Sequence, residues 1–314
     1  MFKNFSPPAL GINGRQSEMI ELALTYAFSG LDIDMTDMVR RTSRTNAADA
    51  TKYLTSAARA YEQQDKPLNW GGFNTEINLD ADEDTFNAAV ANLSPVADLA
   101  HDIGLTRGYI SIPAGTDRLP YQEYFEHQKN RIGQVSEVLA SREIKLGLLQ
   151  TAGSNAADEL QFEFVRTVEH FSSLVKACGE NVGYVINTWD WRVGGGGMSH
   201  LETIDVSDIV AVILSSVTPD VDVEAATVTD RVLPIVEGDF PHTELLKHLK
   251  TIGYEGPVSP GCSPLQYKGQ TRESIVKESQ ENIDAIFEAA GLEVIPLPMD
   301  LIEDIPYETS TSIT

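Results

Sequence analysis

Short apolar runs alternate along the chain with longer stretches in which apolar residues recur every three or four positions. A short apolar run is typical of a buried strand, and the longer spacing is typical of a helix with one apolar face. The predicted strands cover residues 9–13, 30–35, 68–73, 106–112, 144–150, 182–187, 209–215 and 257–260. The predicted helices cover residues 16–26, 47–61, 82–102 and 121–141, a face within 160–175, and segments around 245–249 and 275–286. Pro95 either lies within the third of these helices or starts a new helix after Ser94.

The eight strand and helix units follow one another without a change of composition that would indicate a linker. This order favours an α/β fold, a single (β/α)8 TIM barrel, over a doubly wound sheet. The alternative fold commonly carries a GxGxxG turn, and Gly11-Ile12-Asn13-Gly14 lacks its last glycine. We expect one barrel domain over residues 1–291 and a proline-containing acidic extension over residues 292–314, which lies along the surface or reaches a partner.

Charge and hydrophobicity narrow the possible partners. The 314 residues include 23 Lys and Arg against 47 Asp and Glu, which gives a formal net charge of −24. Nucleic acid and anionic membrane surfaces would be repelled. The longest apolar stretch, residues 209–214, is far shorter than the roughly 20 residues that span a membrane, and residues 1–8 show no secretory signal. We therefore expect a cytoplasmic protein whose partner is a small molecule, with neither nucleic acid nor a membrane as partner.

The barrel prediction also indicates where chemistry belongs, because the active sites of such barrels lie at the carboxyl ends of the strands. Polar residues at the predicted strand ends are Asn13, Asp34, Asn74, Glu76, Gln150, Asn187, Asp190, Ser215, Ser216 and Cys262. Asp32 and Asp34 are two residues apart on one predicted strand, so they point to the same side. Asp34 is the better candidate because it is nearer the end of that strand.

Several segments resemble the xylose isomerase-like TIM barrels, a superfamily of sugar-phosphate isomerases and epimerases that also includes endonuclease IV. Residues 18–23 (EMIELA) and 28–33 (FSGLDI) are similar to the family's first helix and second strand. Residues 231–240 (RVLPIVEGDF) are similar to its loop after strand seven, and residues 249–260 (LKTIGYEGPVSP) to its last strand. The resemblance extends over residues 9–290 and implies the barrel fold and chemistry on a sugar-like compound.

The resemblance also implies a divalent cation, Mn, Mg, Zn or Co, bound by carboxylates and histidines at the strand ends. This sequence departs from that pattern at nearly every position. Gln150 and Asn187 replace two carboxylates, Asp190 replaces a histidine, and Ile213 and Gly261 stand at the last two ligand positions. Amides keep the hydrogen-bonding shape of a carboxylate but lose the charge that balances a cation. We therefore predict no metal ligands, and no cofactor beyond the cation that the resemblance alone implies.

The remaining polar residues are suited to a sugar-like ligand. Gln150 and Asn187 can each donate and accept hydrogen bonds with a polyol. Trp189, with Trp191, either stacks on the ligand's apolar face or packs against the barrel helices. Arg192 and Arg231 either bind an anionic group or form salt bridges. His200 follows the glycine run 194–197 and is the one histidine we place near the barrel mouth.

For catalysis we single out three carboxylates, Glu237, Asp190 and Asp34, as candidates for proton transfer. The function indicated by the resemblance is that of an isomerase or epimerase for a sugar, an inositol or a similar hydroxy-carbonyl compound. The alternative is a catalytically inactive relative that binds a carbohydrate-like ligand or a protein partner, and the substituted metal positions favour it. DNA repair is disfavoured by the net charge of −24 and the six scattered histidines. The resemblance further suggests a homo-oligomer.

Overall fold

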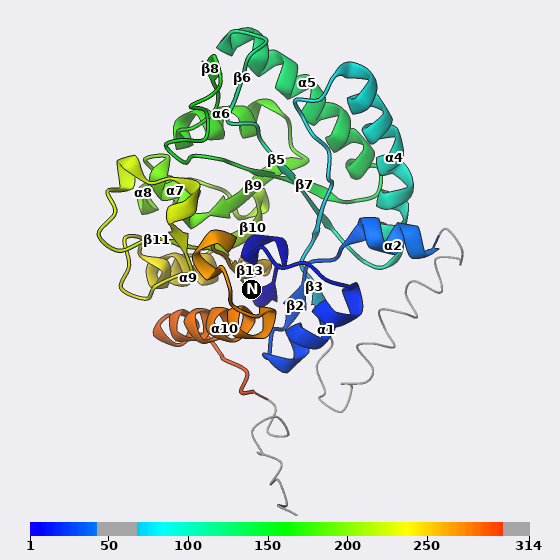
Figure 1. The fold of residues 1–314 in the computed structure, drawn as a ribbon. Helices are drawn as coiled ribbons and strands as arrows, with labels where there is room; N and C mark the ends of the chain where they lie inside the picture. The colour runs from blue at the N-terminus through cyan, green and yellow to red at the C-terminus, as the bar shows by residue number, and fades with distance from the viewer. Residues whose placement is uncertain (43–67, 298–314) are drawn as a thin grey trace, which may run out of the picture.

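The computed structural model describes residues 1–42 and 68–297, and its centre is a parallel sheet (Figure 1). The strands are β1 (Phe2–Phe5), β2 (Gly30–Leu31), β3 (Asn69–Trp70), β4 (Phe73–Asn74), β5 (Arg107–Ser111), β7 (Lys145–Leu149), β9 (Val182–Asn187), β10 (Ile209–Leu214) and β13 (Pro257–Pro260). Their order across the sheet is β3-β2-β1-β13-β10-β9-β7-β5-β4. β9 and most of β10 are buried on both faces, as expected of parallel barrel strands.

The two ends of this sheet meet in one extended segment. β3 pairs with β2, and β4 pairs with β5, yet only Gly71 and Gly72 separate β3 from β4. The Gly71 N–H donates to the Leu31 carbonyl at 2.9 Å, and the Ile33 N–H donates to the Gly72 carbonyl at 2.8 Å. Residues 69–74 therefore act as one strand that closes the sheet. The predicted TIM barrel is confirmed.

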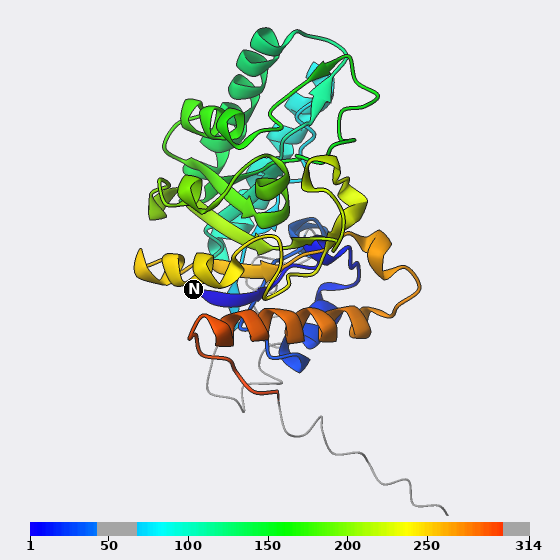
Figure 2. The same ribbon diagram turned by 90° about the vertical axis from the view of Figure 1, so that its left-hand side faces the viewer.

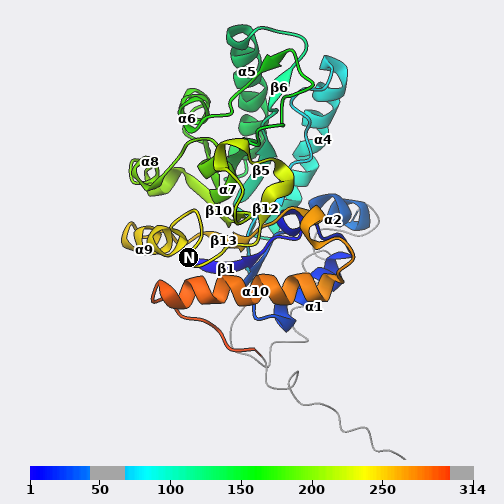
Figure 3. The same ribbon diagram turned by 60° about the vertical axis from the view of Figure 1, so that its left-hand side comes forward.

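Helices form the outer layer around the strands. They are α1 (Gln16–Thr25), α2 (Met35–Thr42), α4 (Glu83–Asp102), α5 (Tyr121–Ala140), α6 (Val168–Ala177), α7 (Thr188–Val193), α8 (Met198–Leu201), α9 (His242–Thr251) and α10 (Arg272–Ala289). Side-chain caps start several of them: Asp82 accepts from the Thr85 N–H, and Thr271 accepts from the Ser274 N–H. Figures 2 and 3 show α10 running below β1 on the outside of the barrel, where it also contacts β13 and α9.

Two short antiparallel ladders lie in the loops that follow the strands. β6 (Gly115–Thr116) pairs with β8 (Phe162–Glu163), and β11 (Ser216–Val217) pairs with β12 (Arg231–Val232). The second ladder brings Arg231 back beside the end of β10. Across residues 1–42 and 68–297, the structure contains no helix that is both long and apolar enough to cross a membrane.

The first predicted strand was wrong. Residues 8–10 form a 3-10 helix after Pro7, and Gly11 then adopts a left-handed φ of 65°. The true first strand, β1, was missed because it contains Lys3 and Asn4. Lys3 is only 5% exposed, and its charge is balanced by Asp284 of α10 at 2.6 Å. A buried ion pair of this kind interrupts the run of apolar residues by which a buried strand is predicted.

Three smaller predictions also need correction or completion. The second predicted strand is shorter than expected, because α2 already begins at Met35. The apolar face within residues 160–175 is helical only from Val168, since β8 occupies residues 162–163. Pro95 lies inside α4, which continues through it. The predicted helix at residues 47–61 lies outside the described residues, as does most of the predicted C-terminal extension.

Candidate functional site

A cavity of about 360 Å³ opens at the carboxyl ends of the barrel strands. Its lining combines residues at the ends of β1, β2, β4, β5, β7, β9, β10 and β13 with the loop that follows β1 and with Arg231. This volume lies at the small end of the range for ligand pockets. The position agrees with the one expected from the barrel fold.

One side of the cavity carries a hydrogen-bonded carboxyl group. The Asn4 Nδ2 donates to Asp32 Oδ1 at 3.0 Å and to Ser259 Oγ at 2.9 Å. Ser6 and the backbone of Gly72 also hydrogen-bond to Asp32. Burial nevertheless outweighs these contacts and raises the pKa of Asp32 to about 6. A carboxyl group with this pKa is able to accept and return a proton near neutral pH.

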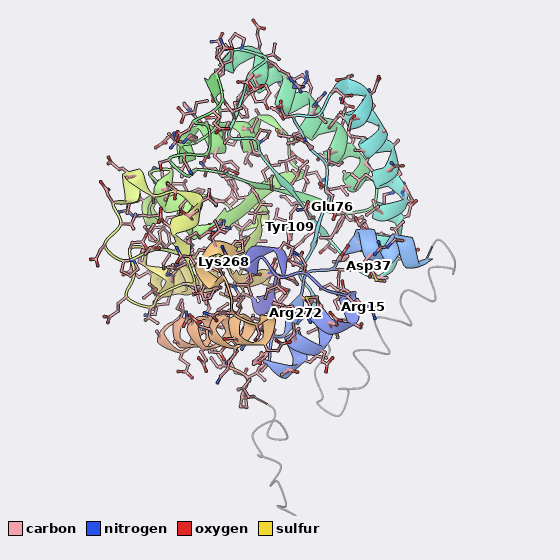
Figure 4. The ribbon with its side chains drawn as sticks, viewed as in Figure 1. Arg15, Asp37, Glu76, Tyr109, Lys268 and Arg272 are labelled. Carbon is pink, nitrogen blue, oxygen red and sulfur yellow. The ribbon has the colours of Figure 1, made fainter. Side chains whose placement is uncertain are left out.

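Tyr109 on β5 (labelled in Figure 4) is near enough to Asp32 for the charge of that carboxyl group to act on its hydroxyl. Its side chain is 8% exposed and lines the cavity, and its hydroxyl has no hydrogen-bond partner. Burial, assisted by the negative charge of Asp32, holds the pKa of Tyr109 well above its usual value. The hydroxyl is therefore protonated, and it lies buried at the wall of the cavity with its donor unused.

The glycines that split the third strand make room for both groups. A Cβ on Gly71 would lie 2.2 Å from Asp32 Oδ1, and a Cβ on Gly72 would lie 2.3 Å from the Tyr109 hydroxyl. Neither distance is compatible with a side chain. The Gly71-Gly72 pair is thus the sequence feature that admits Asp32 and Tyr109 to the cavity.

Two further polar groups lie at the start of α1 and α2. Gln16 is 1% exposed, and its Oε1 accepts from the Asp34 N–H at 2.9 Å, while its Nε2 has no partner. Asp34 lies at the exposed rim of the cavity and accepts from the Asp37 N–H at 2.8 Å. Asp34 thereby fixes the first turn of α2, and the Gln16 Nε2 is buried beside the cavity without a partner.

Glu76 lies on the same rim and has a left-handed backbone, with φ 56°. The Asn74 side chain accepts from the Glu76 N–H at 2.8 Å, and Thr36 donates to Glu76 Oε2 at 2.7 Å. A glutamate at positive φ is strained, and such strain is concentrated at functional sites. This geometry makes Glu76 a candidate ligand contact.

The cavity lining contributed by β7, β9 and β10 is aliphatic except for Asn187, and it packs against the Tyr109 side chain. Leu149 of β7, Val185 of β9, and Ala211 and Ile213 of β10 lie next to one another on paired strands. Asn187 stands at the end of β9 and also lines the cavity. Its Oδ1 already accepts from the Trp189 N–H at 3.1 Å, which begins α7.

Arg231 completes the lining near the mouth. Its Nη1 lies 3.8 Å from Asp190 Oδ2, its Nη2 donates to the Cys262 carbonyl at 3.4 Å, and its buried Nε has no partner. Asp190 lies behind Arg231, where its Oδ1 accepts from the Ala152 N–H at 3.0 Å. Burial raises the pKa of Asp190 to about 6 although Arg231 opposes the shift. Asp190 therefore positions Arg231 and the loop after β7.

Of the predicted site residues, Asp34, Asn187 and Arg231 line the cavity. Gln150 instead donates its amide to the Arg166 carbonyl at 2.6 Å, and Trp189 is fully buried in an apolar cluster with Val217 and Ala226. Three more predicted residues do not line the cavity: Arg192 in α7, His200 beside Glu169, and Glu237 in an exposed loop. The sequence pattern singles out neither Tyr109 nor Gln16, and it favours Asp34 over Asp32.

The aliphatic wall does not fit a divalent cation. Ile213 faces the cavity at a position where the family resemblance implies a ligand, Leu149 faces it in place of Gln150, and the Asn187 oxygen is already engaged. A Cβ on Gly261 would lie 2.6 Å from Ile213 Cγ2 and 2.9 Å from Ser215 Oγ, so a carboxylate side chain has no room there. In the part of the chain that the structure describes, no group of three or more His, Cys, Asp and Glu side chains is placed to hold a metal ion.

Comparison with known proteins assigns the family. Residues 20–290 match the family of xylose isomerase-like TIM barrels, and the chain belongs to it. A search of curated protein sequences gave no match.

Solved structures show the same fold at low sequence identity. A xylose isomerase domain protein from Alicyclobacillus acidocaldarius subsp. acidocaldarius is 20% identical, with a TM-score of 0.77 over 93% of this chain and 99% of that one. The IolI protein with a bound zinc atom is 16% identical, with a TM-score of 0.72 over 92% and 99%. D-psicose 3-epimerase from Clostridium cellulolyticum H10, solved with D-tagatose, is 12% identical, with a TM-score of 0.65 over 92% and 99%.

Proposed function

We propose that the protein is an isomerase or epimerase that moves a proton on a small hydroxy-carbonyl compound such as a sugar or an inositol derivative. The observation that carries the proposal is Asp32, a carboxyl group inside the cavity with a pKa of about 6. A general base is most effective when its pKa lies near the working pH. The D-psicose 3-epimerase and D-tagatose 3-epimerase-like structures that share the fold support the reaction class.

In this proposal the Asp32 carboxylate removes a proton from a carbon next to the substrate carbonyl, and the carbonyl oxygen gains negative charge. Tyr109 and Gln16 line the cavity, and when the ligand binds, their buried polar atoms turn toward it and donate hydrogen bonds to that oxygen, which stabilises the charge. For isomerisation, Asp32 returns the proton on the same face to the former carbonyl carbon, while the hydroxyl proton of the deprotonated carbon passes to the former carbonyl oxygen and leaves a new carbonyl there. For epimerisation, a proton from a second donor, by way of solvent, reaches the other face of the same carbon, and Asp32 gives up its proton to solvent. Asn4 and Ser6 hold the Asp32 carboxyl group in one orientation.

The three carboxylates predicted from the sequence have different roles in this proposal. Asp34 lies on the rim and remains a candidate for proton exchange with solvent. Asp190 acts through Arg231, which binds an anionic or strongly polar end of the substrate. Glu237 is exposed on its loop and has no part in the proposal. No step requires a metal ion.

A second function is favoured by the aliphatic wall of Leu149, Val185, Ala211 and Ile213. A cavity with these side chains in its lining is suited to binding a carbohydrate-like ligand without converting it to a product. In this alternative the protein is a binding protein with the same ligand class. A cytoplasmic location and a homo-oligomeric state stay predictions.

Exchange of carbon-bound hydrogen with solvent distinguishes the two functions. The purified protein is incubated in D2O with a panel of ketoses and inososes, and NMR follows both ligand binding and the loss of C–H signals next to the carbonyl. The proposal expects exchange with at least one compound that binds, and its loss in Asp32→Asn. Asp98→Asn, on the exposed face of α4, should exchange like the wild type. Binding without exchange would establish the second function instead.

A further inference from the structure

Asn187 presents a hydrogen-bond donor to the cavity without any rearrangement. The residue is 6% exposed and lines the cavity. Within the described residues its Nδ2 has no hydrogen-bond partner, and this atom is not closed off from solvent as the Tyr109 hydroxyl and the Gln16 Nε2 are. The unpaired Nδ2 therefore opens into the cavity, where a ligand atom can reach it.

The strand and the helix that Asn187 joins fix the direction of its amide. Successive side chains of a strand alternate between its two faces, so Asn187 points to the same side as Val185, which also lines the cavity. Asn187 Oδ1 accepts from the Trp189 N–H at 3.1 Å and caps the start of α7. An amide turned by half a rotation would place its NH2 group against that N–H. The oxygen therefore faces α7, and the nitrogen faces the cavity.

The neighbours of this amide on the paired strands are apolar. In the parallel ladder Asn187 pairs with Ile213, and Val185 pairs with Ala211; all four residues line the cavity. A hydrogen bond in such surroundings is stronger than the same bond in water, because the local dielectric constant is low. A donor that is already fixed in direction needs no reorganisation when it meets a charge that develops during a reaction.

We infer that Asn187 is a further catalytic residue, whose Nδ2–H donates a hydrogen bond to the substrate oxygen that becomes negatively charged. The inference rests on the proposed function for the reaction itself. When Asp32 removes the proton, the C–H electron pair forms the new C=C bond and the carbonyl π electrons move to the oxygen. The Asn187 amide stabilises this oxyanion, and none of its own bonds breaks. An amide donor thus stands where the resemblance implies a carboxylate ligand of a cation.

Two substitutions separate this role from the capping of α7. Asn187→Asp and Asn187→Ser both keep an oxygen that accepts from the Trp189 N–H, both remove the Nδ2 donor, and only the first adds a charge. The assay is deuterium exchange of the compound in the ketose and inosose panel that the wild type exchanges fastest. Excess chelator prevents any variant from recruiting a cation. We expect kcat to fall about 100-fold in each variant, with KM changed less than about three-fold.

A binding measurement tests the donor without turnover. Glycolohydroxamate resembles the enediolate that the proposed reaction forms, and dihydroxyacetone is the corresponding ketone. NMR titration gives both dissociation constants. In Asn187→Ser the preference for glycolohydroxamate should fall about ten-fold, because only the oxyanion-like probe depends strongly on the donor. Asp82→Asn exchanges a carboxylate for an amide at the N-cap of α4, away from the cavity lining, and should keep both kcat and the preference.

Wild-type kcat in either Asn187 variant, a loss confined to KM, or an unchanged preference for glycolohydroxamate would overturn the inference. So would failure of the wild type to bind glycolohydroxamate. The outcome is separable from the proposed reaction. If the wild type exchanges no compound while Asn187→Ser still loses the preference, the reaction is wrong and the donor assignment stands. Exchange that survives in both Asn187 variants would remove this inference alone.

Discussion

At the scale of single residues, the raised pKa of Asp32 affects both the stability of the fold and the proposed reaction. Its folded-state pKa of about 6 exceeds the ordinary value of 3.8, so the folded protein binds more protons than the unfolded chain between about pH 4 and pH 6. Stability therefore falls as the pH rises through this window, and it stays reduced above it. A charged group is kept in the cavity at a cost to the fold, as is usual for catalytic carboxylates.

Asp32→Asn removes this charge and should stabilise the protein where Asp32 is ionised. We expect a gain of about 1–2 kcal/mol at pH 8, after allowance for the side chain's partial exposure to the cavity, and no gain at pH 4. Urea unfolding at the two pH values measures the difference. Destabilisation at pH 8 would show that the ionised carboxyl group is held more favourably than its burial indicates.

The backbone strain at Glu76 can be compared with that at Glu143, which has nearly the same backbone conformation. Their φ angles are 56° and 57°, but Glu143 lies before β7, at the opposite end of the barrel from the cavity. Glycine adopts this conformation without strain. Glu76→Gly and Glu143→Gly should each raise the free energy of unfolding by up to about 1 kcal/mol.

Only Glu76→Gly should also weaken ligand binding and exchange, since only Glu76 lines the cavity. Thermal unfolding and ligand titration of the two variants check both halves of this prediction. Unchanged ligand binding in Glu76→Gly would contradict the assignment of Glu76 as a ligand contact.

At the scale of elements, the Gly71-Gly72 break in the third strand both closes the barrel and opens the site. Gly71→Ala would bring a methyl group to 2.2 Å from Asp32 Oδ1 and 2.5 Å from Asn4 Oδ1. We expect a loss of about 1–3 kcal/mol in stability together with loss of exchange. Gly133→Ala, within α5, meets no atom within 4 Å and should stabilise the helix by about 1 kcal/mol. Full exchange in Gly71→Ala would contradict the assigned role of this break.

Element patterns were also the part of the structure best predicted from the sequence. Runs such as residues 182–187 and 209–214 are buried on both faces, so their apolar character alone identified them. Residues 2–5 do not look like a buried strand because they include the charged Lys3. Lys3 can be buried only because Asp284, near the other end of the chain, pairs with it. Such long-range pairing leaves no mark on local periodicity.

At the scale of the whole molecule, the fold and the position of the site were predictable, but the identity of several site residues was not. Gln150 was placed in the cavity, yet Leu149 faces it and Gln150 contacts Arg166. A shift of one residue along a strand exchanges its two faces, and a strand that is apolar on both faces does not reveal which one points inward. The sequence also does not reveal the polar part of the cavity lining, because Gln16, Asp32 and Tyr109 come from three separate segments of the chain.

The central claim is that Asp32 transfers a proton in this cavity without a metal ion. The most direct test is the pH dependence of kcat/KM for deuterium exchange, measured in excess chelator on wild type and Asp190→Asn. Because the pKa of Asp32 is about 6, the rate should rise about ten-fold between pH 5 and pH 7. Asp190→Asn should keep this rise even if its overall rate is lower. Loss of exchange in chelator with recovery on added Mn or Zn, or a flat profile between pH 5 and pH 7, would contradict the claim.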